Sequence, residues 1–146
     1  MINYGFTEFE KDVKELTRLV KKEFEPEVLL AVARGGLTIG HFMANALKNR
    51  NLFVLNSIHY DDDKKLDTVE VFNIPDLSKY KRVLIVEDII DSGESMVEIL
   101  RILKDLYPEV EFKTATLFYK ERALVKPDFT IKEAKDWIVF LWDIEI

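Results

Sequence analysis

The sequence predicts an α/β fold in which a central, mainly parallel sheet carries helices on both of its faces. Short continuous apolar runs such as 28–32 and 83–86 are typical of strands buried on both faces. Segments with helical spacing of apolar residues alternate with these runs, which favours right-handed crossover connections between parallel strands. The chain has 146 residues, of which 48% are apolar and 33% charged, so it is long enough to bury a core.

The first part of the chain predicts a helix, a strand and a second helix. Thr7 and Glu10 form a capping-box pattern that places a helix over about 7–23. Its apolar positions recur at helical spacing and are Phe9, Val13, Leu16 and Val20. The strand at 28–32 stops at an Arg-Gly-Gly sequence, and 37–48 has the pattern of a second helix.

The middle of the chain predicts two strands joined by a polar segment. The run at 52–58 reads as another buried strand, while 69–72 alternates between apolar and polar residues as a half-buried strand does. Between them, 60–65 is too polar for either regular structure, so a loop is expected. A turn is expected at 74–76.

The last part of the chain repeats the alternation. We expect a buried strand at 83–86, a polar loop, a helix at about 95–107 and a strand at 112–118. The segment 119–146 is less regular, and 137–140 is its best strand. We find no internal repeat or linker, so one domain spanning 1–146 is expected.

Composition narrows the classes of function. The chain has no cysteine, which excludes disulfides and thiolate metal sites and fits a cytoplasmic location. Its net charge of −6 argues against a dedicated nucleic-acid binder. It lacks both an apolar run of the roughly 20 residues that span a bilayer and a signal-peptide pattern. A small-molecule ligand and no membrane partner are therefore expected.

The strongest chemical signal follows the strand at 83–86. In parallel sheets, ligands bind at the carboxyl ends of the strands. Here Glu87 and Asp88 can accept hydrogen bonds from vicinal hydroxyls or hold Mg²⁺. Residues 91–95 are small and polar ahead of a helix, so their amides, with the hydroxyls of Ser92 and Ser95, can bind an anion. Nine consecutive residues could therefore bind a diol, a metal ion and a phosphate. The alternative interpretation is an N-capped acidic loop that binds no ligand.

Three other motifs are absent from the sequence. It contains no Gly-x-x-x-x-Gly-Lys-Ser/Thr, so a nucleoside-triphosphate P-loop is not indicated. No Gly-x-Gly-x-x-Gly follows the first buried strand, which argues against a dinucleotide cofactor. The acids are spaced Glu-Asp-x-x-Asp rather than Asp-x-Asp, unlike aspartyl-phosphate hydrolases.

With these residues in view, the sequence resembles the type I phosphoribosyltransferases. The Glu-Asp-Ile-Ile-Asp-Ser-Gly sequence at 87–93 is similar to their phosphoribosyl pyrophosphate motif, and 31–37 is similar to their pyrophosphate loop. Residues 118–120 and 137–143 resemble the segments that form their purine-binding hood. The resemblance covers nearly the whole chain and is best to bacterial xanthine-guanine (6-oxopurine) phosphoribosyltransferases. It implies a type I fold with a small hood from about 119–146.

The resemblance implies separate roles for the three acids. Glu87 and Asp88 would hold the ribose hydroxyls directly or through Mg²⁺, so both are candidate metal ligands. Asp91 would lie near purine N7 and act as the general base. The residues that would wrap the 5-phosphate are Ser92, Gly93, Glu94 and Ser95. Glu94 departs from the family pattern, in which small or basic residues are more common, so its side chain is expected to point away and only its backbone to take part.

The pyrophosphate loop is the second part of the donor site that the resemblance implies. Two glycines let the backbone approach a bulky anion, and Arg34 can clamp its oxygens. An Arg-Gly-Gly sequence alone is also a common tight turn. By resemblance, the loop consists of Ala33, Arg34, Gly35 and Gly36, with an unusual backbone at Ala33-Arg34.

The resemblance also implies the purine site. Lys120 would donate to a purine 6-oxo group, although a solvent-facing lysine is the alternative. Trp137 would stack on the base, although a core tryptophan is equally compatible with the sequence. Ile138 and Asp143 would contact the base through main-chain atoms. The polar loop, taken as about 60–68, corresponds to a closing lid or to a solvated charge run.

Together these expectations describe a Mg²⁺-dependent transferase of purine salvage. It would move the 5-phosphoribosyl group from phosphoribosyl pyrophosphate to N9 of guanine, xanthine or hypoxanthine, giving GMP, XMP or IMP and pyrophosphate. The ranking among the three bases and the oligomeric state are not fixed by sequence, although the family favours homo-oligomers. His41 and His59 have no partners at metal spacing and are interpreted as structural. The alternatives are a regulator of this fold that senses nucleotides, and an enzyme with another base acceptor.

Overall fold

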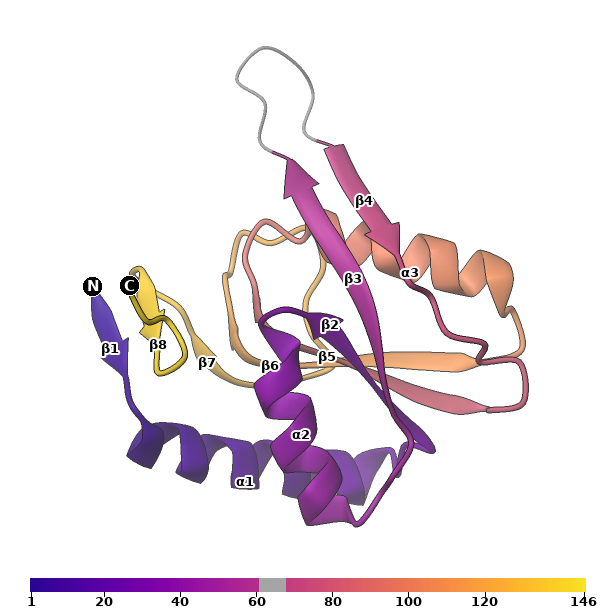
Figure 1. Cartoon of the computed structure of the whole chain (residues 1–146), viewed down its shortest axis with the longest axis horizontal. Coiled ribbons are helices and arrows are strands. Elements are labelled where there is room, and N and C mark those ends of the chain that lie inside the picture. Colours follow the sequence, from indigo (N-terminus) through magenta and orange to yellow (C-terminus); the bar gives the residue numbers. More distant parts are fainter. Residues whose placement is uncertain (61–67) are drawn as a thin grey trace.

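The computed structural model describes residues 1–60 and 68–146, and in this part of the chain a six-stranded sheet lies at the centre (Figure 1). Its strand order is β4-β3-β2-β5-β6-β7. All neighbouring strands are parallel except β3 and β4, which are antiparallel. The strands are β2 (Val28–Ala33), β3 (Leu52–Tyr60), β4 (Thr68–Phe72), β5 (Arg82–Ile90), β6 (Glu111–Tyr119) and β7 (Phe129–Glu133). The predicted mainly parallel sheet is confirmed.

Helices cover both faces of the sheet, as predicted (Figure 1). The helices α1 (Phe6–Glu23) and α2 (Gly36–Leu47) pack on one face, and α3 (Glu94–Leu106) packs on the other. On β5, Leu84 belongs to the apolar cluster under α1 and α2, whereas its neighbour Ile85 belongs to the cluster under α3. Both side chains are fully buried, which explains why this strand reads as a continuous apolar run.

A second, two-stranded sheet joins the first residues of the chain to the last (Figure 1). It consists of β1 (Ile2–Tyr4) and β8 (Ile138–Phe140), which run parallel with Ile2 opposite Ile138. The buried hydroxyl of Tyr4 donates a hydrogen bond of 2.6 Å to Asp12 of α1. Burial, and then this bond, raise the pKa of the Tyr4 hydroxyl. The hydrogen bond of Tyr4 thereby anchors the two-stranded sheet on α1.

Two local expectations were wrong. Helix α1 begins at Phe6 with Gly5 as its N-cap, and no side chain makes a capping hydrogen bond there. Because the helix starts earlier than the capping-box pattern indicates, Thr7 lies inside its first turn and cannot act as the cap. The strand expected at 83–86 continues to Ile90, because β6 continues to Tyr119 and pairs with it. Glu87 and Asp88 therefore lie within a strand rather than in a loop.

Two further strands, β1 and β7, were not predicted. Most of the loop expected at 60–65 lies outside the described residues, as does the lid interpretation of about 60–68, except at Tyr60 and Thr68, which end β3 and begin β4.

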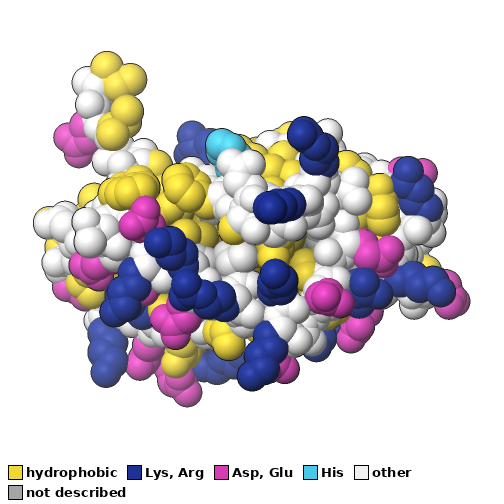
Figure 2. All heavy atoms as spheres, turned by 90° about the horizontal axis from the view of Figure 1, so that it is seen from below, with side chains coloured by type: hydrophobic (Ala, Val, Ile, Leu, Met, Phe, Trp, Pro, Cys, Tyr) yellow, Lys and Arg dark blue, Asp and Glu magenta, His cyan; other side chains and the backbone are white. Residues whose placement is uncertain are grey.

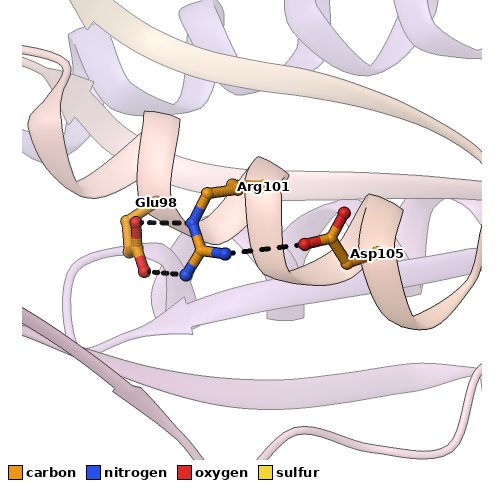
Figure 3. A network of polar contacts seen from close by, with 3 residues as sticks. All are labelled: Glu98, Arg101 and Asp105. Carbon is orange, nitrogen blue, oxygen red and sulfur yellow. Dashed lines mark hydrogen bonds and ion pairs between the residues drawn. The ribbon is translucent and has the colours of Figure 1, made fainter.

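The outer surface carries charges of both signs. On α3, Arg101 binds Glu98 one turn before it and contacts Asp105 one turn after it (Figure 3). Figure 2 shows one face of the molecule, on which lysine and arginine side chains are interspersed with acidic and apolar ones. Within the described residues, no helix is both long enough and apolar enough to cross a membrane.

Candidate active site

The acids of β5 face two adjacent pockets at the carboxyl end of the sheet. Glu87 lines a pocket of about 360 Å³, here named the turn pocket, together with Ser92, Gly93 and Ser95. Asp88 lines a pocket of about 230 Å³, here named the hood pocket. Adjacent residues of a strand point to opposite sides. The pair is therefore divided between the two pockets, with the next acid along the chain, Asp91, lining both.

The turn pocket is built around Gly93 at the start of α3. Gly93 has a φ of 87°, a left-handed conformation that glycine adopts without strain. A β-carbon at this position would stand 2.9 Å from the amide nitrogen of Leu124, and that amide donates a hydrogen bond of 2.8 Å to the carbonyl of Ser92. The segment after β6 thus holds the turn in place while the helix N-terminus faces the pocket.

Glu94, the departure from the expected pattern, directs its carboxylate to the end of β3. Its Oε2 lies 2.9 Å from Nε2 of His59. His59 also lines the turn pocket. Because the two residues lie on different elements far apart in sequence, local spacing carried no signal for this contact. His41 instead lies 3.3 Å from the Asn45 amide on α2.

The turn between β2 and α2 lies directly against the acid pair. The peptide bond between Ala33 and Arg34 is cis. A β-carbon at Gly35 would stand 2.2 Å from Oδ2 of Asp88, so only glycine allows this close approach. Arg34 is exposed beside it, and Gly36 begins α2. Of the four residues expected to form the pyrophosphate loop, Gly35 and Gly36 therefore adjoin the acids of β5, and Ala33 and Arg34 directly precede them in the chain.

The carboxyl groups of Glu87 and Asp88 both have raised pKa values. Burial, and then the charge of Asp88, raise the pKa of Glu87 well above its usual range. Burial also raises the pKa of Asp88. The described residues contain no group of three or more acids, histidines or cysteines arranged to hold a metal. Glu87 and Asp88 could thus present two neighbouring carboxylates to a cation. The positive charge of that cation would reduce the repulsion between them.

The hood pocket brings together every residue expected at the purine site. It is lined by Asp88, Ile89, Asp91, Lys120, Trp137, Ile138, Phe140 and Asp143. Trp137 is 69% exposed, so it is not a core residue. Its carbonyl accepts a hydrogen bond of 2.8 Å from the amide of Ile2, which fixes it to β1. Asp143 closes a turn by accepting from the Phe140 amide at 2.9 Å. Phe140 is a lining residue that sequence reasoning missed.

Asp91 is the residue where the two pockets meet. Its Oδ1 lies 3.1 Å from Nζ of Lys120 and 3.4 Å from Nη2 of Arg122. Lys120 follows the last residue of β6, and its amide donates to the carbonyl of Ile90 at 3.0 Å. Arg122, which lines the turn pocket, was also missed, although its place two residues after Lys120 is a signal that could have found it.

Divided acids, a glycine turn before a helix and a hood pocket at the carboxyl ends of parallel strands define the chain as an α/β protein with a candidate ligand site at that edge of its sheet. The chain matches the phosphoribosyl transferase domain family over residues 6–146, and it belongs to that family.

Individual relatives agree with this assignment. The chain is similar to a solved xanthine-guanine-hypoxanthine phosphoribosyltransferase of Helicobacter pylori, with a TM-score of 0.89, 34% identity and coverage of 97% of this chain and 94% of that one. A purine phosphoribosyltransferase of Pyrococcus horikoshii gives a TM-score of 0.87, 27% identity and coverage of 99% and 95%. The xanthine-guanine phosphoribosyltransferase of Vibrio parahaemolyticus is 32% identical over 117 residues, which are 80% of this chain and 71% of the relative.

Proposed function

We propose that this protein is a purine-salvage enzyme that transfers the 5-phosphoribosyl group from phosphoribosyl pyrophosphate to N9 of a 6-oxopurine. The observation that carries the proposal is the hood pocket, which joins a cationic donor, Lys120, to an exposed aromatic ring, Trp137, beside Asp91. A neutral 6-oxo group needs a hydrogen-bond donor, and a planar base needs a stacking partner. The names of the Helicobacter and Vibrio relatives support this class of base.

The turn pocket is the proposed site of the donor's ribose 5-phosphate. The amides after Gly93 and the hydroxyls of Ser92 and Ser95 suit a phosphate at a helix N-terminus. Glu87 and Asp88 would bind the ribose hydroxyls between the two pockets. The departing pyrophosphate would lie against the β2–α2 turn, where the exposed Arg34 can pair with its oxygens.

The donor set also suits Mg²⁺. This cation binds oxygen ligands and commonly uses one or two carboxylates, with water and substrate phosphate completing its shell. Glu87 and Asp88 supply such a pair, and a cation beside them would oppose the effect of burial and of the Asp88 charge, which raise the pKa of Glu87. When bound, Mg²⁺ would offset negative charge on the departing pyrophosphate.

In the proposed reaction, the bond between the anomeric carbon and the pyrophosphate oxygen breaks as purine N9 bonds to that carbon. The leaving electron pair goes to pyrophosphate, and Asp91 accepts the proton that the purine ring nitrogen loses. Lys120 would hold the 6-oxo group and stabilise negative charge that spreads onto it. The acids of β5 would offset positive charge on the ribose ring.

We further propose that the protein is a single domain with a hood from about 119–146, and that it is a cytoplasmic homo-oligomer. The alternatives are a nucleotide-sensing regulator of the same fold and an enzyme that uses another base.

Turnover tests the function directly. The protein should convert guanine, xanthine or hypoxanthine with phosphoribosyl pyrophosphate and Mg²⁺, and should use adenine poorly because an amino group opposes the Lys120 ammonium. Product nucleotide and pyrophosphate would be measured, with a chelator as the control. A folded sample that turns over no 6-oxopurine would rule out this function.

A further inference from the structure

We propose that Arg122 is a binding residue for the donor's 5-phosphate, and that it pairs with Asp91 while no ligand occupies the turn pocket. This inference rests on the proposed function, because it assigns a further residue to the same donor site. Three observations carry it: the charge of the turn pocket, the attachment of the segment that bears Arg122, and the way in which its guanidinium is paired.

The turn pocket is lined by two acids and, among its described lining residues, by one arginine and no lysine. The acids are Glu87 and Asp91, and the arginine is Arg122. His59 lies there too, 2.9 Å from the carboxylate of Glu94. A phosphate dianion placed beside two acids needs a full positive charge in addition to the partial charges of the backbone amides. Arg122 is the side chain in position to supply it.

The backbone around Arg122 is fixed to the phosphate turn. On one side, the Lys120 amide donates to Ile90 at 3.0 Å, and on the other the Leu124 amide donates to Ser92 at 2.8 Å. The Ala123 amide donates to Lys120 at 3.0 Å, which closes a turn around Arg122. The segment therefore stays at the rim of the pocket while the Arg122 side chain, 75% exposed, can change its direction.

The present partner of Arg122 leaves its guanidinium able to bind an anion. Nη2 lies 3.4 Å from Oδ1 of Asp91, an oxygen that also lies 3.1 Å from Lys120. A guanidinium has three nitrogens with five hydrogens, a fork that suits two oxygens of one phosphate. If Arg122 turned to the phosphate, Lys120 would still be beside Asp91 until a purine arrived.

Binding of ribose 5-phosphate, which carries the phosphate but lacks the pyrophosphate, tests this role without requiring turnover. Arg122→Gln should weaken its affinity about tenfold, as expected for loss of one charge-assisted pair. Arg122→Lys should recover part of the loss. Lys126→Gln is the matched control, because Lys126 lies on the same segment and pairs with Glu121. That variant should bind as the wild type does.

Kinetics separate a phosphate contact from an effect through Asp91. Arg122→Gln should raise KM for phosphoribosyl pyrophosphate with little change in kcat, and affinity for pyrophosphate alone should be unchanged. Unchanged affinity for ribose 5-phosphate, or a fall in kcat at constant KM, would overturn the proposal. A wild-type protein that binds ribose 5-phosphate but turns over no purine would instead count against the proposed function.

Discussion

The carboxylate of Asp88 lies so close to Gly35 that a β-carbon on Gly35 would stand 2.2 Å from its Oδ2. The turn after β2 and the end of β5 are therefore fitted together at this contact. Asp88 is half-buried, and its neighbours Glu87 and Ile89 pair with β6, so a larger residue at position 35 would meet a carboxylate held by the sheet.

Gly35→Ala should accordingly displace Asp88 or the turn. We expect a loss of stability of about 1–3 kcal/mol, the usual cost of overpacking. We also expect an increase of roughly tenfold or more in KM for phosphoribosyl pyrophosphate, measured by initial rates. Gly5→Ala is the control, because a β-carbon there would have no neighbour within 4 Å. Equal kinetics for the two variants would show that the contact is dispensable.

Asp91→Asn should lower kcat by about 10²–10⁴, because asparagine cannot accept the proton, while binding of guanine changes little. Single-turnover kinetics and titration calorimetry would measure the two effects separately. Asp105→Asn, which alters an exposed carboxylate that pairs with Arg101, serves as the control. Unaltered kcat in the Asp91 variant would remove this residue from the chemistry.

Trp137→Ala should weaken binding of the base and leave the KM for phosphoribosyl pyrophosphate unchanged. Stacking of a base on an aromatic ring contributes about 1–3 kcal/mol, so KM for guanine should rise roughly five- to hundredfold. Because Trp137 is 69% exposed, its loss should leave the fold intact, as circular dichroism would check. Leu106→Ala removes another exposed apolar side chain, at the end of α3, and should change neither KM. A KM for guanine that stays constant in Trp137→Ala would argue against stacking.

Glu27 gives a pH-dependent prediction for stability. Its carboxylate accepts hydrogen bonds from the amides of Lys81 and Arg82 at 2.8 and 3.0 Å, and the first of these lowers the pKa of Glu27. A lowered pKa stabilises the fold above the unfolded-state pKa, and this contribution is lost as pH falls through the folded-state value. Glu27→Gln should therefore be less stable at pH 7 by about 1 kcal/mol.

The difference between the wild type and Glu27→Gln should begin to shrink as pH falls below the unfolded-state pKa of about 4.3, and should disappear once pH is below the lowered pKa of the folded protein, where the wild-type carboxyl group is itself protonated. Urea titrations at several pH values would measure the free energy of unfolding. Glu109→Gln removes an exposed charge and should show a much smaller pH-dependent difference. A gap that stays constant down to pH 3 would mean that the carboxylate charge is not responsible.

The sequence predicts the central sheet well, because the central residues of β2, β5 and β6 are buried on both faces and are mostly apolar. It fails for β1 and β7, which are too short or too mixed to show a period and form only because Ile138 and Ala115 lie beside them. The end of β5 was also missed, since Glu87 looks like a loop residue until its pairing with Thr116 is known.

The sequence likewise predicts one part of the candidate site and not another. Glu87, Asp88 and Asp91 lie in one continuous motif, so their neighbourhood could be predicted from the chain itself. Contacts between distant segments could not be predicted in this way. His59 meets Glu94, and Arg122 meets Asp91, only after β3 and β6 reach the same edge of the sheet.

The pairing of β1 with β8 has a consequence for the order of folding. Ile2 and Ile138 must meet across almost the entire described chain, and closing so long a loop costs more entropy than joining neighbouring strands. We therefore expect the two-stranded sheet to form after the central sheet and to open before it in the native protein. Amide hydrogens of β1 and β8 should exchange with solvent faster than those of β2 and β5. The base-binding end would then be the last part of the molecule to fold and the first to unfold locally.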